Sequence, residues 1–409
     1  MNPIYNFGIR AYALGARLLA TRKEKVRKML DGQRQTFDRL AAMLDPSCRY
    51  IWIHASSLGE FEQGRPLIEM IRRELPDRHI LLSFFSPSGY EVRKDYDLVD
   101  AVVYLPLDLP KNAARFIDLV HPEMAIFVKY EFWGNYLSEL KHRNIPTYII
   151  SSIFREKQIF FRSWGGMFRK MLRCFTHLYV QDEASRRLLA GIGVENVTVA
   201  GDTRFDRVTD ILDNVKSVPQ AEAISSTAAT TIVAGSTWPA DEQFLLPYFN
   251  THENLRLIIA PHEVNEERIC QIEQNVSRPC VRLSKSTPEQ AADADCLIVD
   301  CFGMLSSIYH FGDVAYIGGG FGAGIHNINE AAVHSVPVIF GPKHQKFKEA
   351  ADLISLGGAF TFNDAREFAD TLDSLTADSA SLRAAGDAAG QYIRDNLGAT
   401  RRIFNDIFA

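Results

Sequence analysis

The chain has 409 residues, of which 46% are hydrophobic and 23% are charged, a balance typical of globular proteins. This length exceeds one ordinary hydrophobic core, so it predicts two domains of roughly 200 residues each. The formal net charge of −5 gives no overall basis for binding nucleic acid, and we expect no nucleic-acid partner.

The cysteines and the N-terminus indicate the compartment. The chain has six cysteines without a C-x-x-C pair or a metal-ligand spacing, which suits a reducing compartment. The first 20 residues lack the charged start and clean apolar core of a cleavable signal peptide.

Residues 1–30 are predicted to form a membrane-associated helical segment. Apolar residues three and four apart form one helical stripe: Ile4, Phe7, Ala11, Leu14 and Leu18. A basic cluster follows, at Arg22, Lys23, Lys25, Arg27 and Lys28. Because Arg10 and Arg17 interrupt the segment, we expect it to lie on an anionic membrane surface rather than to span the membrane. The alternative is an amphipathic helix packed on its own domain.

From residue 50 onward, short apolar runs alternate with helical patterns, which is typical of parallel doubly wound sheets. The first set of predicted strands is 50–55, 80–85, 101–105, 124–128, 147–150, 178–180 and 197–200. Residues 209–229 lose the pattern, contain Pro219 and are predicted to be a linker. The second set is 231–234, 257–259, 296–299, 314–317 and 336–340.

The predicted fold class is therefore α/β, with two doubly wound, Rossmann-like domains facing a central cleft. We place the N-terminal domain at 31–210 and the C-terminal domain at 230–409. The helical segment 381–409 could pack against either domain.

Residues 317–330 (IGGGFGAGIHNINE) are the most distinctive stretch of the chain. A buried strand leads into five glycines within seven positions, where backbone N–H groups could approach a ligand without interference from a Cβ atom. A helix predicted from Asn329 would complete a phosphate site, and Glu330 could accept hydrogen bonds from sugar hydroxyls. The alternative is that the glycines only form a tight turn.

Other uses of tandem doubly wound domains fit less well. The first strand leads into SSLGE rather than G-x-G-x-x-G, and the chain has no G-x-x-x-x-G-K-[ST], which disfavours a dehydrogenase and a P-loop kinase. Glycosyl transfer from a nucleotide sugar remains, with the nucleotide in the C-terminal domain and the acceptor in the N-terminal domain.

Six motifs in register resemble the 3-deoxy-D-manno-octulosonic acid (Kdo) transferases of lipopolysaccharide synthesis, a family with the GT-B fold. They are HASSLGE at 54–60, YEFWGN at 130–135, GDTRFD at 201–206, GSTWPADE at 235–242, GGGFGAGIHNINEAA at 318–332 and VPVIFGP at 336–342. Four departures from the family pattern stand out. Lys129 occupies a position where the family often has an acidic residue, Arg204 replaces a lysine and Trp238 replaces a histidine. The Pro-Arg-His motif appears as Ala260-Pro261-His262, without its arginine.

The resemblance implies a donor, an acceptor and a location. The donor is CMP-Kdo and the acceptor is a lipid A precursor, and transfer inverts the anomeric centre without a metal or another cofactor. The implied location is the cytoplasmic face of the bacterial inner membrane, with peripheral or monotopic attachment through the N-terminal segment. Two alternatives are another GT-B enzyme that uses a UDP-sugar (a glycosyltransferase or 2-epimerase) and a non-catalytic protein that binds lipid A precursor.

Glu60 is the predicted catalytic base, because it follows the first strand and matches the family's catalytic glutamate. A helix N-terminus would lower its pKa, so substrate binding would have to desolvate it. The alternative is a carboxylate that only caps its helix.

The remaining site residues are assigned from the motifs and from a basic, aromatic segment. Residues 154–175 hold six basic residues, one acid, five phenylalanines and Trp164, a mixture that would suit a phosphorylated lipid at a membrane; the alternative is a partly buried helix. Acceptor contacts are expected from Ser57, Gly59, Glu131, Arg155 and Arg162. Donor contacts are expected from Arg204, Ser236, Thr237, His262, Gly319, Gly320, Gly322, Asn327, Asn329 and Glu330.

Overall fold

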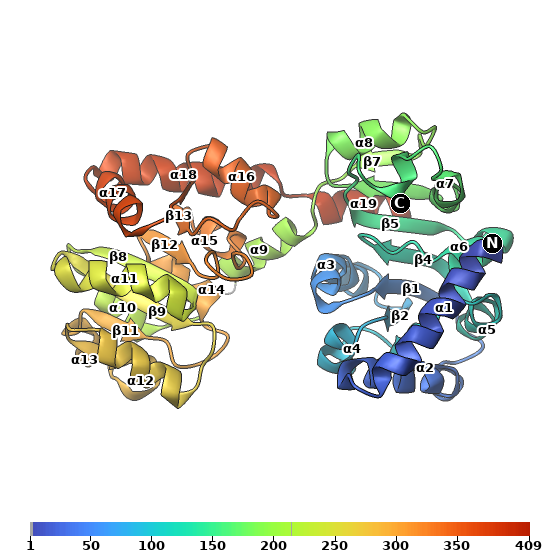
Figure 1. Ribbon diagram of the computed structural model, residues 1–409, viewed down its shortest axis with the longest axis horizontal. Helices are drawn as coiled ribbons and strands as arrows, with labels where there is room; N and C mark the ends of the chain where they lie inside the picture. The colour runs from blue at the N-terminus through green and yellow to red at the C-terminus, as the bar shows by residue number, and fades with distance from the viewer. Residues whose placement is uncertain (1–2, 214) are drawn as a thin grey trace. The chain divides into compact units, whose positions relative to one another are not determined.

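The computed structural model describes residues 3–213 and 215–409 (Figure 1). Residues 1, 2 and 214, which belong to the predicted N-terminal segment and the predicted linker, lie outside the described residues. The chain forms two compact units: the first runs to Asp206 and includes Leu397–Ala409, and the second is Arg207–Asn396.

The first unit is built on a seven-stranded parallel sheet in the order β3-β2-β1-β4-β5-β6-β7. Its strands are β1 (Tyr50–Ala55), β2 (His79–Phe84), β3 (Ala101–Tyr104), β4 (Pro122–Val128), β5 (Thr147–Ser152), β6 (His177–Val180) and β7 (Val197–Val199). Its helices are α1 (Pro3–Ala20), α2 (Glu24–Met43), α3 (Leu58–Glu74), α4 (Pro87–Arg93), α5 (Pro110–Val120), α6 (Gly134–His142), η1 (Ile159–Phe161), α7 (Gly166–Leu172), α8 (Glu183–Ala190) and α19 (Ala399–Phe408).

Both faces of this sheet are covered, so most residues of its strands are buried, although the edge strand β7 is half-buried. In β1, Ile51 and Ile53 face the core beneath α3, whereas Tyr50 and Trp52 face the core beneath α5 and α6. Figure 1 shows α3 and α4 on one side of the sheet and α5 and α6 on the other. This double coverage explains why the strands read as continuous apolar runs.

The second unit repeats the plan with the order β10-β11-β9-β8-β12-β13-β14, again parallel. Its strands are β8 (Thr230–Thr237), β9 (Leu255–Pro261), β10 (Cys280–Arg282), β11 (Cys296–Ile298), β12 (Val314–Ile317), β13 (Val338–Phe340) and β14 (Ala359–Thr361). Its helices are α10 (Pro219–Ser225), α11 (Pro239–Thr251), α12 (Glu266–Asn275), η2 (Leu283–Lys285), α13 (Pro288–Ala292), α14 (Leu305–Ile308), η3 (Tyr309–Phe311), α15 (Asn329–Ala332), α16 (Lys348–Ser355), α17 (Ala365–Thr376) and α18 (Ser379–Asp395).

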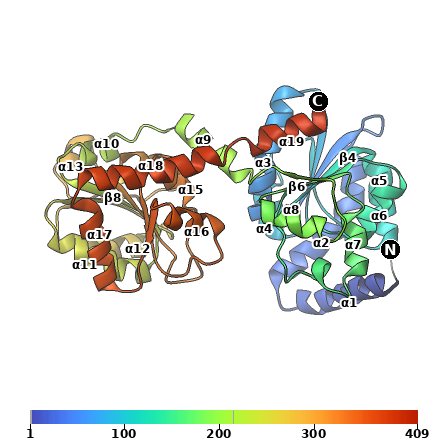
Figure 2. The same cartoon turned by 90° about the horizontal axis from the view of Figure 1, so that it is seen from above.

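The predicted doubly wound α/β fold is confirmed, but two segments differ from the prediction. The predicted linker is partly helical, because α9 (Arg204–Asp213) and α10 lie within or across it. The last helix, α19, belongs to the first unit and not to the C-terminal domain. It packs beside α3 (Figure 2), where Ile403 is fully buried and the Asp206 carboxylate accepts hydrogen bonds from the backbone N–H of Gly398 and Thr400.

Candidate active site

The first unit places two carboxylates at the point where its strand order reverses. β1 lies between β2 and β4, and ligands of doubly wound sheets bind beyond the carboxyl ends of the strands at such a point. Glu60 follows β1 on the first turn of α3, and Glu131 follows β4. Between β4 and Glu131, Lys129 has a left-handed backbone (φ 68°), a conformation that concentrates at functional sites.

Glu60 caps its own helix and is also positioned to act chemically. Its Oε2 accepts hydrogen bonds from the backbone N–H (3.0 Å) and the hydroxyl (3.2 Å) of Ser57, so the predicted alternative of a capping carboxylate is present. Among the described residues no hydrogen bond reaches Oε1. Gly59, one position earlier, is exposed, and a Cβ atom there would meet no neighbouring atom.

The predicted direction of the Glu60 pKa is wrong. Burial raises the pKa of this carboxyl, and the nearby charge of Glu131 raises it further, against smaller opposing effects of His54 and Ser57. The helix N-terminus is outweighed because the side chain is partly withdrawn from water beside a second carboxylate. Burial and Glu131 thus bring the pKa of Glu60 closer to neutral pH than that of an ordinary glutamate, a direction that favours a general base.

His54 connects Glu131 to the core of the sheet, and the sequence interpretation did not single it out. Its Nε2 lies 3.0 Å from Glu131 Oε2, and its Nδ1 lies 2.9 Å from Ser83 Oγ. Trp133 Nε1 donates to the same Glu131 oxygen (2.5 Å), and Trp52 Nε1 donates to Ser83 Oγ (2.8 Å). The signal was a histidine inside a fully buried strand, where an imidazole needs partners for both nitrogens.

α1 is fastened to the loops at this same edge of the sheet. The Tyr5 hydroxyl donates to the buried Asp108 carboxylate (2.5 Å), which also accepts the backbone N–H of Asn135. The Asn135 side chain donates to Asn6 (2.9 Å). α1 therefore holds the loop that leads from Glu131 into α6.

A row of rings continues this contact toward Glu131. Tyr12 of α1 lies 6.4 Å from Phe85, and Phe85 lies 4.7 Å from Trp133, measured between ring centroids. Because Trp133 donates to Glu131, this row of rings connects α1 to a side chain that holds Glu131 in place.

The apolar stripe predicted in residues 1–30 lies outside the packed face of α1. α1 buries Ala13 and Ala16, whereas Ile4, Phe7, Leu14 and Leu18 are 60–73% exposed. Among the described residues, no helix combines the length and the hydropathy of a membrane span.

The expected aromatic surface at 154–175 is mostly core. Phe154, Phe160 and Phe175 are buried, with Phe160 packed 4.8 Å from Phe132, and Trp164 is the large apolar residue of the segment that stays exposed. These phenylalanines belong to the core on the face of the sheet that α5 and α6 cover, and α7 packs against α6. The basic side chains Arg155 and Arg162 are exposed, as the acceptor assignment requires.

Arg204 belongs to a different unit of the chain from the other predicted donor contacts. It lies in the first unit, and its guanidinium pairs with the buried Asp202 carboxylate (2.7 Å), which also accepts from Gln63. Two acidic residues of the GDTRFD motif therefore stabilise the first unit. Asp202 pairs with Arg204, and Asp206, the last residue of the motif, caps α19.

The remaining predicted donor contacts gather at the carboxyl edge of the second sheet. Ser236 and Thr237 end β8, His262 follows β9, and the glycine loop follows β12. Ser236 has a left-handed backbone (φ 53°) at an irregularity in β8, and the Thr237 hydroxyl donates to Glu242 (2.8 Å). β8 lies between β9 and β12, so these residues flank the strand-order reversal of this sheet.

The glycine loop is more self-contained than predicted. The Gly319 N–H donates to Asp241 (2.9 Å), and the N–H groups of Gly322 and Gly324 donate to the Gly319 carbonyl. A Cβ atom on Gly320 would lie 2.6 Å from the Gly341 backbone, so that glycine permits close packing of two loops. Gly322 is exposed. The following helix, α15, is a single turn, so its dipole is too short for the predicted anion site.

Three rings meet beside this loop. Trp238 stacks on His262 (centroids 4.6 Å apart), and His262 stacks on His326 (4.5 Å). Trp238 Nε1 donates to His326 Nε2 (3.2 Å), so that nitrogen is the unprotonated one. Burial lowers the pKa of His326, and the neighbouring His262 lowers it further. His262 is exposed although it stacks on both other rings. The sequence analysis predicted His262 as a donor contact but did not predict that it stacks on Trp238 and His326.

Asn327, Asn329 and Glu330 form a small polar group at the end of the loop. The Asn327 side chain donates to Glu330 Oε1 (2.9 Å) and accepts the Asn329 N–H (3.2 Å). Burial raises the pKa of Glu330, and Asn327 and Arg207 oppose the shift. Asn329 is buried, and its Oδ1 has no hydrogen-bond partner among the described residues.

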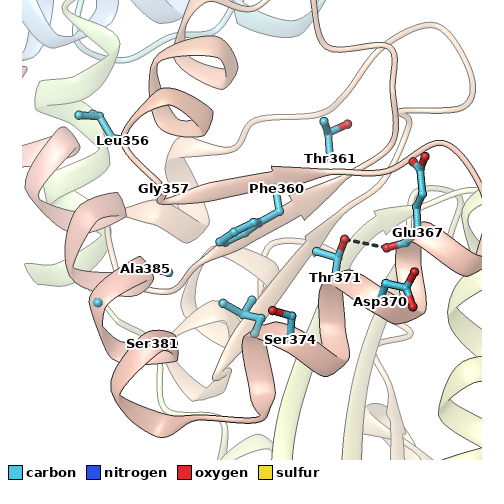
Figure 3. A pocket seen from close by; sticks show the side chains of 12 residues that line it. Leu356, Gly357, Phe360, Thr361, Glu367, Asp370, Thr371, Ser374, Ser381 and Ala385 are labelled. Carbon is cyan, nitrogen blue, oxygen red and sulfur yellow. Dashed lines mark hydrogen bonds between the residues drawn. The ribbon is translucent and has the colours of Figure 1, made fainter.

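A hollow in another part of the second unit does not suit a nucleotide. It has a volume of about 820 Å³ and is lined from β14, α17 and α18 (Figure 3). Glu367 and Asp370 contribute carboxylates, and its lining side chains include no Lys, Arg or His, so phosphate would be repelled. Within the described residues, no three His, Cys, Asp or Glu side chains are grouped as metal ligands.

Sequence comparison gives consistent relatives. The family model of the 3-deoxy-D-manno-octulosonic-acid transferases matches residues 12–207. A 3-deoxy-D-manno-octulosonic acid transferase of Bordetella pertussis is 27% identical over 386 residues, covering 88% of this chain and 87% of the relative. Its namesake from Haemophilus influenzae is 24% identical and covers 88% of this chain and 87% of the relative.

Similar solved structures share the fold. The UDP-GlcNAc 2-epimerase of Neisseria meningitidis has a TM-score of 0.60 at 12% identity, covering 88% of this chain and 99% of the other. Acinetobacter baumannii MurG has a TM-score of 0.56 at 11% identity, covering 87% and 98%. The fold is therefore the two-domain α/β fold of the GT-B class, as predicted.

Proposed function

This chain belongs to the Kdo transferase family, and we propose that it transfers Kdo from CMP-Kdo to a lipid A precursor with inversion at the anomeric carbon. The first unit binds the acceptor and supplies the base, and the second unit binds the nucleotide. The observation that carries the proposal is the pair of carboxylates, Glu60 and Glu131, at the strand-order reversal of the first sheet.

Glu60 removes the proton from the acceptor hydroxyl. Its Oε1 is available for this contact, while Oε2 remains fixed by Ser57. Glu131 acts through its charge, which keeps the Glu60 pKa raised, and His54 and Trp133 hold Glu131 in place. The exposed Arg155 and Arg162 are assigned to the acceptor's phosphate groups.

The departing CMP is assigned to the carboxyl edge of the second sheet. Ser236, Thr237 and the exposed His262 would contact it, with Asn327 and Glu330 positioned for sugar hydroxyls. Because Gly319 and Gly320 are occupied with internal contacts, Gly322 and its exposed neighbours are the part of the loop left for phosphate. The proposal needs no metal, so transfer should persist in EDTA.

Peripheral attachment at the cytoplasmic face of the inner membrane completes the proposal. It is supported by the exposed apolar stripe of α1, which lies on a helix fastened to the loops around Glu131. An acyl chain at that stripe would place the acceptor's sugar near the carboxylate pair.

The decisive test supplies purified protein with CMP-Kdo and lipid A precursor and analyses the product by mass spectrometry. We expect addition of Kdo, and thermal protection of the protein by CMP but not by UDP. Protection by UDP instead would favour an enzyme that uses a UDP-sugar, the activity class suggested by the epimerase-like fold. Binding of the precursor without any product would favour a non-catalytic binding protein.

A further inference from the structure

A small basic hollow lies between the C-terminal part of α1 and α2. It has a volume of about 310 Å³, and its polar lining is Arg17, Thr21, Arg27, Asp31 and Arg34. Arg17 lies twelve residues after Tyr5, which corresponds to roughly 18 Å along the helix. The hollow is therefore distinct from the contacts that Tyr5 makes with the active-site loops.

The charges of this hollow are not balanced by the protein. Arg34 pairs with Asp31 (3.2 Å), whereas Arg17 and Arg27 form no ion pair within the described residues. Residues 17–34 as a whole hold seven basic and two acidic side chains. Two arginines, one from each helix, thus line a hollow that can admit a phosphate group and that has an excess of positive charge.

The position of the hollow beside apolar side chains indicates the source of the anion. Leu14 and Leu18, 60% and 67% exposed, stand on α1 within one turn of Arg17. An interfacial helix that buries such leucines among acyl chains brings its adjacent arginines to the level of the lipid headgroups. A soluble phosphate ion would use the arginines but would leave the leucines in water.

We propose that the hollow between α1 and α2 binds the headgroup phosphate of an anionic membrane phospholipid, with Arg17 and Arg27 as its direct ligands. This inference rests on the proposed peripheral membrane attachment, but not on the identity of the transferred sugar. It differs from general electrostatic attraction because it depends on two particular arginines rather than on the number of charges.

The test compares two double variants with the same loss of charge. Arg17→Gln/Arg27→Gln removes the proposed ligands, and Arg22→Gln/Lys25→Gln removes exposed charges of the same segment that do not line the hollow. Co-sedimentation uses vesicles of phosphatidylglycerol in phosphatidylcholine, with pure phosphatidylcholine as the lipid control. Thermal unfolding of each variant checks that the fold is retained.

High salt separates general electrostatic attraction from binding in the hollow. Salt screens the attraction between exposed charges and the membrane more strongly than it screens contacts to a phosphate held between two arginines. In 0.5 M NaCl we expect the wild type and Arg22→Gln/Lys25→Gln to bind alike, and Arg17→Gln/Arg27→Gln to bind at least fivefold more weakly. Equal losses in both variants at every salt concentration would overturn the proposal. Displacement of the wild type from the vesicles by 10 mM inorganic phosphate would overturn the lipid assignment.

A second readout separates this proposal from the proposed function. Both double variants should transfer Kdo to a detergent-solubilised acceptor as fast as the wild type, since neither pair belongs to the active site. A wild type without transfer activity would refute the proposed function and leave the vesicle comparison valid.

Discussion

The chemistry proposed for Glu60 depends on two opposing influences on one carboxyl group. Ser57 stabilises the charged form through two hydrogen bonds, whereas burial and the charge of Glu131 favour the protonated form. Burial and Glu131 outweigh Ser57, so the pKa is raised. A residue that served only as a helix cap would be expected to have a lowered pKa. The raised pKa thus shows that the hydrogen bonds of the cap do not dominate this carboxyl.

Replacing Glu60 with Gln tests this distinction. Gln keeps an oxygen for Ser57 but cannot accept the acceptor's proton, so turnover should fall by about 100-fold or more while CMP still protects the protein. In the wild type, turnover should be lost as the pH falls through the Glu60 pKa, at a midpoint above the ordinary value of 4.5. Steady-state rates between pH 4 and pH 9 give both quantities, and turnover near the wild-type level would exclude Glu60 as the base.

The stability of the same variant provides a second check with a defined sign. A carboxyl whose pKa is higher in the folded state makes folding less favourable as the pH rises from the unfolded value through the folded value. Glu60→Gln should therefore be more stable than the wild type at pH 8 and lose this advantage near pH 4. Thermal unfolding at the two pH values measures the difference, and a destabilised variant at pH 8 would indicate a structural cap.

The three stacked rings beside the glycine loop, Trp238, His262 and His326, offer a test for donor binding. Trp238→Phe keeps a ring on His262 but removes the hydrogen bond to His326, so the KM for CMP-Kdo should rise about three- to tenfold with little change in kcat. Trp238→Ala should weaken donor binding further. Leu372→Ala, in the core of the same unit, controls for general destabilisation, and equal KM values in all three variants would argue against a donor role.

Individual residues differ in how far the sequence could identify them. Glu60 could be found because a motif marks it, but the direction of its pKa could not, because Glu131 lies 71 positions away in the chain. His54 was missed because its role depends on Ser83 and Glu131, which only the fold brings together. The sequence identified the glycine loop, but it could not show which glycines pack against other loops, because that depends on the fold.

Among the strands, those with long apolar patterns were predictable, whereas two of the three-residue edge strands were not. β1 and β12 match the predicted ranges, since both are continuous apolar runs between polar ends. β10 and β14, three residues each at opposite edges of the second sheet, were missed because so short a run carries no periodicity. In the segment 154–175 the composition suggested a surface, yet its phenylalanines cover the sheet.

The arrangement of the two units leads to a test of where α19 belongs. Ile403 is fully buried in the core of the first unit, so Ile403→Ala should lower that unit's free energy of unfolding by about 2–5 kcal/mol. CMP is proposed to bind the second unit, and only that unit's thermal transition should rise when CMP is added. In calorimetry, Ile403→Ala should lower the CMP-insensitive transition and Leu372→Ala the CMP-sensitive one, and the opposite pattern would contradict the assignment.

The return of the chain to its first unit also sets the order in which the protein is completed during synthesis. When residues up to Asp206 have left the ribosome, the face of α3 that receives Ile403 still lacks its partner, and the Asp206 carboxylate has no helix to cap. Residues 207–396 must be translated first, which takes roughly 10–40 s at 5–20 residues per second. The nascent second unit can close on its own during this interval, because all its strands precede residue 396. The first unit therefore completes its folding after the second, once α19 has left the ribosome.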